Sequence, residues 1–192
     1  MDIQVVITGR TPLVLHNVRL ADPLDPYARA IAQITAKGKD QTDADRVEVG
    51  KLEWEGSLYS EPGEPLTIPS WNVVACFRDG GKATKKGSTI VRALTPTEVV
   101  CPVDVGSSHG AKMTKENTWR ASARNGGMGR GTVFRTRPRF RDWSLVFSGW
   151  LEEEELSFRD LKTAVERAGH LLGLGDANKL GYGRFEAKVT QS

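Results

Sequence analysis

Apolar side chains follow two different periods along this chain, and the order of these periods limits its fold. Residues 2–8 alternate between apolar and polar side chains, and so do residues 185–189. This period of two predicts half-buried β-strands near both ends of the sequence. Segments that begin at Ser70 and Ser157 place apolar side chains three and four residues apart, which predicts two amphipathic helices. The sequence therefore predicts an α+β fold.

Further strand patterns complete this order. Residues 99–105 alternate, and the segments 132–136 and 142–151 also have the character of strands. The order strand, helix, two strands, helix, strand predicts an antiparallel sheet with helices on one face, which is the ferredoxin-like or RRM-like architecture. We expect one domain over residues 1–192.

Two insertions are expected in this domain. Asp25 stands before a proline, and Thr42 opens a capping box, so residues 25–59 are predicted to form a helical insertion. Residues 106–131 hold six glycines, few apolar side chains and many cations. This composition predicts a long, flexible basic loop or thumb, because loops of this length are usually functional or disordered.

The composition indicates which cellular compartment and which bound groups to expect. The sequence has no run of eighteen apolar residues, which argues against a transmembrane helix, and it shows no secretory leader. Cys76 and Cys101 are too few for a metal cage and are expected to be reduced, buried thiols. Paired-histidine and paired-cysteine metal spacings are also absent. We therefore expect a cytoplasmic protein with no cofactor, no metal and no membrane partner.

The net charge of +3 hides an uneven distribution. Residues 78–92 carry a net charge of +4 and residues 112–141 carry +8, so the remaining residues carry −9. Clustered cations on an otherwise acidic chain are typical of a surface that binds a polyanion. The alternative is that both clusters are solvated loops without a partner. The second cluster is mostly arginine, which favours bidentate phosphate contacts and base stacking.

Four arginines alternate at positions 135, 137, 139 and 141. In an extended strand they would share one face at a spacing of about 6–7 Å, close to the phosphate spacing of an extended single strand. Pro138 interrupts this ladder and suggests an edge or a bend. Phe134, Phe140 and Tyr182 lie among the cations and suit stacking on unpaired bases, whereas Trp143 is expected in the core. These features predict single-stranded nucleic acid, RNA or DNA, as the partner.

A glycine-rich segment lies near the C-terminus and reads Gly173-Leu-Gly-Asp-Ala-Asn-Lys-Leu-Gly-Tyr-Gly-Arg-Phe-Glu-Ala. Its glycines permit positive φ and close approach to a ligand, so the amides of this loop are candidates for cradling phosphate. Lys179 and Arg184 would add charge there. The alternative is a helix C-cap followed by a tight turn and a strand.

This segment resembles the glycine-rich loop of RAMP-superfamily proteins, the RRM-fold subunits that bind guide RNA in CRISPR effector complexes. The stretch Ile68-Pro69-Ser70-Trp71, followed by residues 73–78, is similar to the family's opening of the first core helix. The resemblance implies a RAMP-like fold whose basic insertion acts as a thumb. It also implies a homo-oligomer, as a filament or ring along the nucleic acid, with Trp119 as a candidate contact to a neighbouring subunit.

A second resemblance covers most of the chain. The strings Leu20-Ala-Asp-Pro-Leu-Asp-Pro, Arg135-Thr-Arg-Pro-Arg-Phe and Gly173-Leu-Gly-Asp are similar to those of small proteins of tailed bacteriophages. It implies a phage-encoded protein that acts in the cytoplasm of the bacterial host, and it brings no activity with it.

His16 is the candidate general base, since some RAMP nucleases cleave RNA with a histidine, but no second acid or base can be placed beside it. The main prediction is therefore a non-catalytic protein that binds single-stranded nucleic acid. The alternatives are a phage structural or anti-defence protein-interaction module and a RAMP-like endoribonuclease. The predicted nucleic-acid-binding residues are Lys82, Lys85, Lys86, Lys112, Lys115, Arg120, Arg124, Arg130, Phe134, Arg135, Arg137, Arg139, Phe140, Arg141, Gly175, Lys179, Gly181, Tyr182, Gly183 and Arg184.

Overall fold

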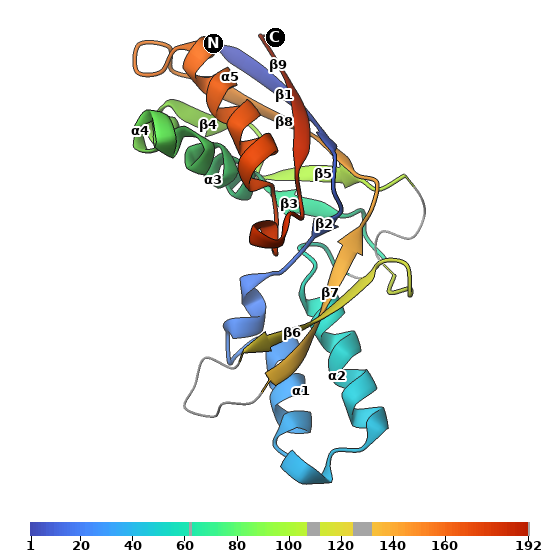
Figure 1. Ribbon diagram of the computed structural model, residues 1–192. Coiled ribbons are helices and arrows are strands. Elements are labelled where there is room, and N and C mark those ends of the chain that lie inside the picture. The colour runs from blue at the N-terminus through green and yellow to red at the C-terminus, as the bar shows by residue number, and fades with distance from the viewer. Residues whose placement is uncertain (62, 107–111, 125–131, 192) are drawn as a thin grey trace.

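The computed structural model describes residues 1–61, 63–106, 112–124 and 132–191 (Figure 1). Its strands are β1 (Asp2–Gly9), β2 (Leu13–Val14), β3 (Thr67–Pro69), β4 (Leu94–Pro96), β5 (Val100–Asp104), β6 (Thr118–Arg124), β7 (Thr132–Phe140), β8 (Ser144–Leu151) and β9 (Phe185–Gln191). Its α-helices are α1 (Pro26–Thr35), α2 (Asp43–Gly56), α3 (Ser70–Gly81), α4 (Gly87–Ala93) and α5 (Phe158–Arg167). An α+β fold with antiparallel sheets is thus confirmed.

The larger sheet has the strand order β3-β5-β8-β1-β9, and β4 also pairs with β8. Every pair in it is antiparallel. Ile3, Val5 and Ile7 of β1 are fully buried, as their alternation predicts. The register places Val5 beside Phe147 of β8 and Val189 of β9. The strands predicted near the two ends of the sequence therefore lie side by side inside one sheet.

Helices α3 and α5 pack on the inner face of this sheet. Phe77 of α3 meets Phe147 of β8 edge to face, with ring centroids 5.7 Å apart. The two helices approach closely at Gly80, where a Cβ would lie 2.2 Å from the carbonyl oxygen of Ala164. Helix α5 continues into a π-helical turn, Ala168–Leu172, and the glycine-rich loop follows directly. Both core helices thus begin where the sequence predicts them, at Ser70 and after the Ser157 cap.

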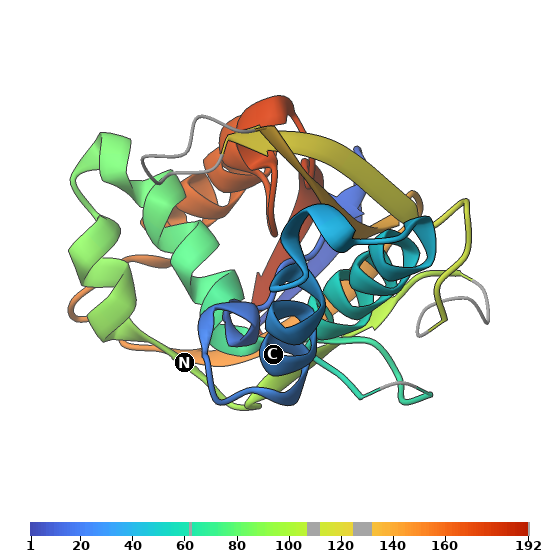
Figure 2. The ribbon, with the colours of Figure 1, turned by 90° about the horizontal axis from the view of Figure 1, so that it is seen from below.

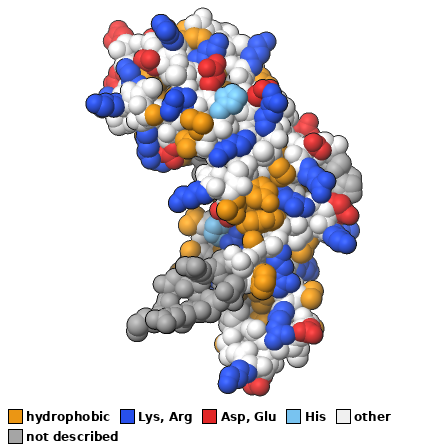
Figure 3. Space-filling model, viewed as in Figure 1, with side chains coloured by type: hydrophobic (Ala, Val, Ile, Leu, Met, Phe, Trp, Pro, Cys, Tyr) orange, Lys and Arg blue, Asp and Glu red, His pale blue; other side chains and the backbone are white. Residues whose placement is uncertain are grey.

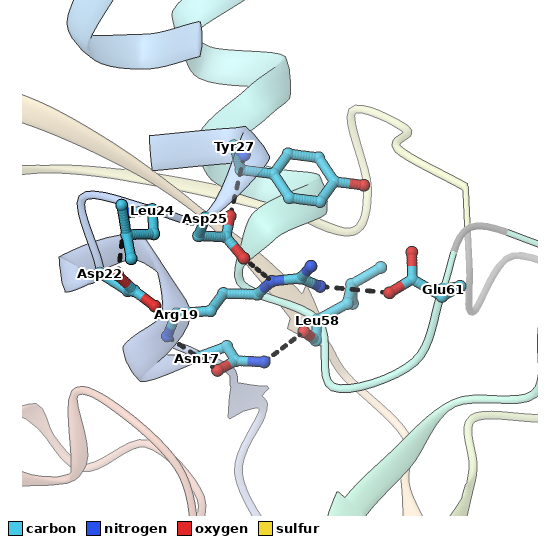
Figure 4. Close-up of polar contacts among 8 residues, drawn as sticks. All are labelled: Asn17, Arg19, Asp22, Leu24, Asp25, Tyr27, Leu58 and Glu61. Atoms are coloured by element: carbon cyan, nitrogen blue, oxygen red, sulfur yellow. Dashed lines mark hydrogen bonds and ion pairs between the residues drawn. The ribbon is translucent and has the colours of Figure 1, made fainter. Parts of the chain in front are cut away.

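The predicted helical insertion forms α1 and α2, which lie side by side (Figure 2). Thr42 and Asp45 form the expected capping box at the start of α2. Arg19 anchors the insertion, since its Nε donates to Asp25 Oδ2 at 2.8 Å and its Nη1 lies 3.3 Å from Glu61 Oε1 (Figure 4). Asp25 also accepts a hydrogen bond from the first turn of α1, so it is a helix cap.

Strands β6 and β7 form an antiparallel ribbon beside α2, with Thr118 opposite Pro138 and Arg124 opposite Thr132. Strand β2 pairs with the other edge of β7. This ribbon corrects the expectation of one long loop over residues 106–131, because β6 lies inside that range. Trp119, Ala121 and Ala123 of β6 alternate with polar residues, but two of these three apolar side chains are only alanines, and pairing with β7 adds to this weak pattern. Residues 107–111 and 125–131 of the expected loop lie outside the described residues.

Both cysteines are buried and unpaired, as expected. Within the part of the chain that the structure describes, no helix is both long and apolar enough to span a bilayer. Over the same residues, no cluster of three or more His, Cys, Asp or Glu side chains is arranged to hold a metal ion.

Candidate nucleic-acid interface

A cavity of about 510 Å³ lies between α3 and the glycine-rich loop. Asn72, Cys76 and Asp79 line it from successive turns of α3. His16 lines it from the segment after β2, and Arg184 from the end of the glycine-rich loop. The structure therefore brings together two features that are far apart in the sequence, the candidate histidine and the glycine-rich loop.

The glycines of this loop serve close packing within the fold. Gly173, Gly175, Gly181 and Gly183 all have positive φ. A Cβ on Gly183 would lie 1.8 Å from the carbonyl oxygen of Leu174, and one on Gly175 would lie 2.4 Å from that of Val14. Several loop amides also donate inside the protein: Leu174 to Gly183, Asp176 to Val14 and Gly183 to Pro12. This corrects the expectation that these amides cradle phosphate, since they are already hydrogen-bonded.

The β6–β7 ribbon contacts the glycine-rich loop through two pairs of side chains. The ring of Trp119 packs edge to face on Tyr182, with centroids 5.4 Å apart. Trp119, expected at a subunit contact, thus packs within its own chain. Arg137, on the strand opposite Trp119, places its Nε 3.7 Å from Asp176 Oδ2. Ribbon and loop therefore form one continuous surface beside the cavity.

The arginines of β7 do not form a uniform ladder of free cations. Arg135 is half exposed, and its Nη1 donates at 2.7 Å to Glu53 Oε1 of α2. Glu53 is 2% exposed and also accepts from the Thr136 amide at 2.8 Å. Arg137 is buried, and burial lowers its pKa although Glu53 and Asp176 oppose that effect. Only part of the predicted ladder is thus presented to solvent.

The far end of β7 differs from this arrangement. Phe140 is 4% exposed and belongs to the hydrophobic core, so its predicted role in base stacking is wrong. Arg139 and Arg141 line a second cavity of about 430 Å³. Arg139 donates to the Glu116 carbonyl at 3.3 Å, and its Nε is buried without a hydrogen-bond partner among the described residues.

Phe134 is the aromatic side chain that the ribbon exposes most clearly, at 59%. The guanidinium of Arg120, from the neighbouring strand, lies 5.2 Å from the centroid of its ring. A cation over an aromatic face is attracted by the ring quadrupole. This pair gives the ribbon an exposed aromatic surface with a positive charge on it.

Three further predicted cations, Lys82, Lys85 and Lys86, lie at the end of α3, away from the ribbon. Lys82 pairs at 2.8 Å with Asp79, which lines the cavity, and Lys86 lies 3.3 Å from Asp160. Lys85 occupies a left-handed turn after α3, with a φ of 60°. Exposed ion pairs of this kind contribute little to stability.

The cations of the predicted thumb fall into two groups. Lys112 and Lys115 are exposed on the approach to β6, and Arg120 and Arg124 belong to that strand. Arg130 lies outside the described residues. Figure 3 shows Lys and Arg side chains around an apolar cluster at the waist of the molecule.

His16 is held at the mouth of the cavity. The hydroxyl of Tyr59 donates to the His16 carbonyl at 2.9 Å. Burial lowers the pKa of the His16 imidazole, and the charge of Arg137 lowers it further against the opposing effect of Asp176. Both effects on the pKa favour the neutral imidazole, which is the form that can accept a proton.

Two comparisons by sequence find nothing. No protein-family model matches the chain, and no curated protein matches it. The structure is similar to a chain in the cryo-EM structure of the Type III-B Cmr-beta bound to cognate target RNA, with a TM-score of 0.46 and 12% identity over 99% of this chain and 60% of that chain. It is also similar to Cmr6 from Pyrococcus furiosus, with a TM-score of 0.41 and 11% identity over 96% of this chain and 97% of that one. The chain spans about 60% of the length of the Cmr-beta chain.

Several side chains of this site are absent from the sequence prediction. Asp176 is part of the glycine-rich segment, and its acidic charge among cations was the signal that could have found it. Glu53, Tyr59 and Asn72 carry no local signal, because they reach the site only through the packing of α2 and α3 against distant strands.

Proposed function

We propose that this chain binds single-stranded nucleic acid, RNA or DNA, without cleaving it. Its surface is formed by the β6–β7 ribbon and the glycine-rich loop. The observation that carries the proposal is the exposed ring of Phe134 under the guanidinium of Arg120. An exposed aromatic ring offers a face for an unpaired base, and the arginine beside it reaches the phosphate.

The neighbouring contact between Trp119 and Tyr182 joins the ribbon to the loop. Trp119 and Arg120 are consecutive in β6, so this contact lies on the ribbon face opposite the Phe134–Arg120 pair. A strand that runs from Phe134 toward Lys179 and Arg184 would therefore pass around the edge of the ribbon. Stacking is indifferent to base identity and phosphate contacts carry no sequence information. We therefore propose binding with little sequence preference.

The fold belongs to the same proposal. In the larger sheet, β9, β1, β8 and β5 follow one another, all antiparallel, with α3 after β1 and α5 between β8 and β9. This order supports a ferredoxin-like, RAMP-like core for the chain. The helical insertion and the ribbon would be additions to that core.

The test is binding of a fluorescent twenty-nucleotide strand, followed by anisotropy. Phe134→Ala and Arg120→Ala should each weaken binding by about 1–3 kcal/mol, which is about 5- to 150-fold. Arg159→Ala is the matched control, because it removes one exposed charge from α5, which is away from the ribbon. If all three variants bound the strand as tightly as the wild type, the proposal would be overturned.

We also propose a phage-encoded protein that assembles along the strand as a homo-oligomer, as the two resemblances imply. The outer face of the sheet supports self-association, because Val6 and Val146 lie opposite each other and are exposed, as is Trp150 of β8. The same exposed face favours the alternative of a protein-interaction module. Particle images with and without oligonucleotide separate the two, since only the first predicts particles that lengthen with the strand.

An endoribonuclease remains a second candidate, because His16 lines the same cavity as Lys179 and Arg184. A general base beside two cations is suited to activating a ribose hydroxyl next to a phosphate. Cleavage of RNA by the wild type, lost in His16→Ala while binding persists, would establish it. Intact RNA after prolonged incubation with the wild type would leave the non-catalytic proposal.

A further inference from the structure

The cavity beside α3 has two chemically different sides. Ile68, Ala75 and Leu174 contribute apolar surface, whereas Asn72 and Arg184 contribute polar groups. Its volume of about 510 Å³ falls within the range of about 300–1,000 Å³ typical of small-molecule sites. A ligand that fits both sides must itself have an apolar part and a polar part.

Arg184 supplies the evidence for an anion. Its Nη1 is buried and has no hydrogen-bond partner among the described residues. Its main chain is fixed, since its amide donates to Thr11 Oγ1 at 2.9 Å and its carbonyl accepts from the Arg10 amide at 2.7 Å. A buried charged donor without a partner is costly, so this guanidinium is poised to pair with an anion. Lys179 lines the same cavity and adds a second positive charge. Asp79 and Asp176 also line it, but each is paired with a cation, Asp79 with Arg78 and Lys82 and Asp176 with Arg137.

The opposite side suits a planar base. The apolar surface comes from α3, from β3 and from the glycine-rich loop, all held by core packing. Asn72, whose side chain is also hydrogen-bonded to Tyr59, carries an amide donor and a carbonyl acceptor, the pattern that reads the edge of a base. Tyr59, which also lines the cavity, has its hydroxyl fixed on the His16 carbonyl. The pocket is therefore largely built before any ligand binds.

We propose that this cavity is a pocket for a single nucleotide of the bound strand, with its base against the apolar side and its phosphate on Arg184 and Lys179. This rests on the proposed binding of single-stranded nucleic acid. It adds that one nucleotide leaves the surface path on the ribbon and enters the body of the protein, where Asn72 contacts the edge of its base.

The test titrates the intact protein, by NMR, with uridine 5′-monophosphate and adenosine 5′-monophosphate, and separately with the nucleosides and inorganic phosphate. At least one nucleotide should bind ten times more tightly than phosphate and than its own nucleoside, because both sides of the pocket must be filled. Equal affinity for nucleotide and phosphate would reduce the site to an anion site and overturn the proposal.

Two variants locate the site. Arg184→Gln removes the charge and keeps most of the side chain, whereas Ala75→Leu fills the cavity from α3 without touching a charge. Both should weaken nucleotide binding at least tenfold, with Arg159→Ala unchanged. Unfolding curves verify that Ala75→Leu is folded, and Arg184→Gln keeps the test decisive if it is not. Unchanged nucleotide binding in a folded variant would overturn the proposal.

The two proposals fail in different ways. If the twenty-nucleotide strand binds and depends on Phe134, but no nucleotide binds the wild type, the pocket is wrong and the surface proposal stands. If the strand does not bind at all, the surface proposal is wrong, and the pocket as a site for one nucleotide of a strand fails with it.

Discussion

Glu53 shows how a single carboxylate controls which cations a surface can offer. It is almost fully buried on α2, and both of its oxygens are occupied, one by the Arg135 guanidinium and one by the Thr136 amide. The same side chain therefore fixes the ribbon on the helical insertion and restrains one of its arginines. Arg120 faces no such restraint in the described residues and lies over Phe134 instead.

Glu53→Gln is expected to destabilise the protein by about 1–3 kcal/mol, the range for a hydrogen bond to a charged group. The amide presents a donor to one of the two groups that now donate to the carboxylate, so one of them loses its partner. Urea unfolding measures the change. Glu153→Gln, in an exposed turn, should stay within about 0.5 kcal/mol of the wild type, and a similarly small effect at Glu53 would contradict the assignment.

His16 gives the stability a defined pH dependence. Burial and Arg137 lower its pKa below the ordinary value of 6.5, so below pH 6.5 the unfolded chain binds more protons at this residue than the folded one. Its contribution to stability is therefore complete above pH 6.5 and falls as the pH drops through that value. The melting temperature should fall less between pH 7.5 and 5.5 in His16→Gln than in the wild type. An equal or larger fall in the variant would show that burial of this imidazole does not cause the pH dependence.

At the level of elements, the glycine-rich loop joins three segments that are distant in sequence. Gly183 packs against the Leu174 carbonyl and Gly175 against that of Val14, which belongs to β2. Gly181 has the same kind of backbone, with a φ of 89°, but a Cβ there would meet no described atom within 4 Å. The loop thus contains glycines needed for contact and one needed only for its backbone conformation.

Gly183→Ala should therefore cost more than Gly181→Ala. In both variants the left-handed backbone of an alanine lowers the free energy of unfolding by about 1–2 kcal/mol. Only Gly183→Ala also places a methyl group against a carbonyl oxygen. Urea midpoints of the two variants, measured side by side, separate the two effects. Equal midpoints would mean that the loop relaxes without cost and that its close packing on residue 174 is unimportant.

The same elements show what could be read from the sequence. β1, β9, α3 and α5 follow from their own apolar periods, and the helix caps at Asp25 and Ser157 follow from local hydrogen bonds. β6 also alternates, but two of its three apolar side chains are alanines, so the glycines and cations around it favoured a loop. The loop was found as a motif, but its amides are used by packing partners, Val14 and Pro12, that no local pattern identifies.

For the whole molecule, the relevant quantity is the separation of charge. The two cationic segments carry +12 against −9 on the rest of the chain. In the structure the second of these segments runs along the ribbon, whereas the first lies around the end of α3 and α4. A strand bound on the ribbon would therefore meet the positive charge of the second segment.

Affinity for single strands should consequently fall steeply as salt rises from 50 to 200 mM, with a slope of log K against log salt of about −0.7 for each phosphate contacted. Arg120→Ala should reduce the magnitude of this slope by about 0.7, the value for one phosphate contact. Arg159→Ala should leave the slope unchanged. Anisotropy titrations at four salt concentrations give the slopes. A flat dependence for the wild type would contradict an electrostatic interface.

The position of β1 has a consequence for how the protein is made. Both neighbours of this strand, residues 144–151 and 185–191, come from the last third of the sequence. During synthesis, β1 therefore leaves the ribosome long before either partner exists, while α1 and α2 are completed early. Two open strand edges are a template for pairing with other chains. The sheet closes only when the C-terminal third has emerged, so a stalled ribosome leaves an aggregation-prone fragment.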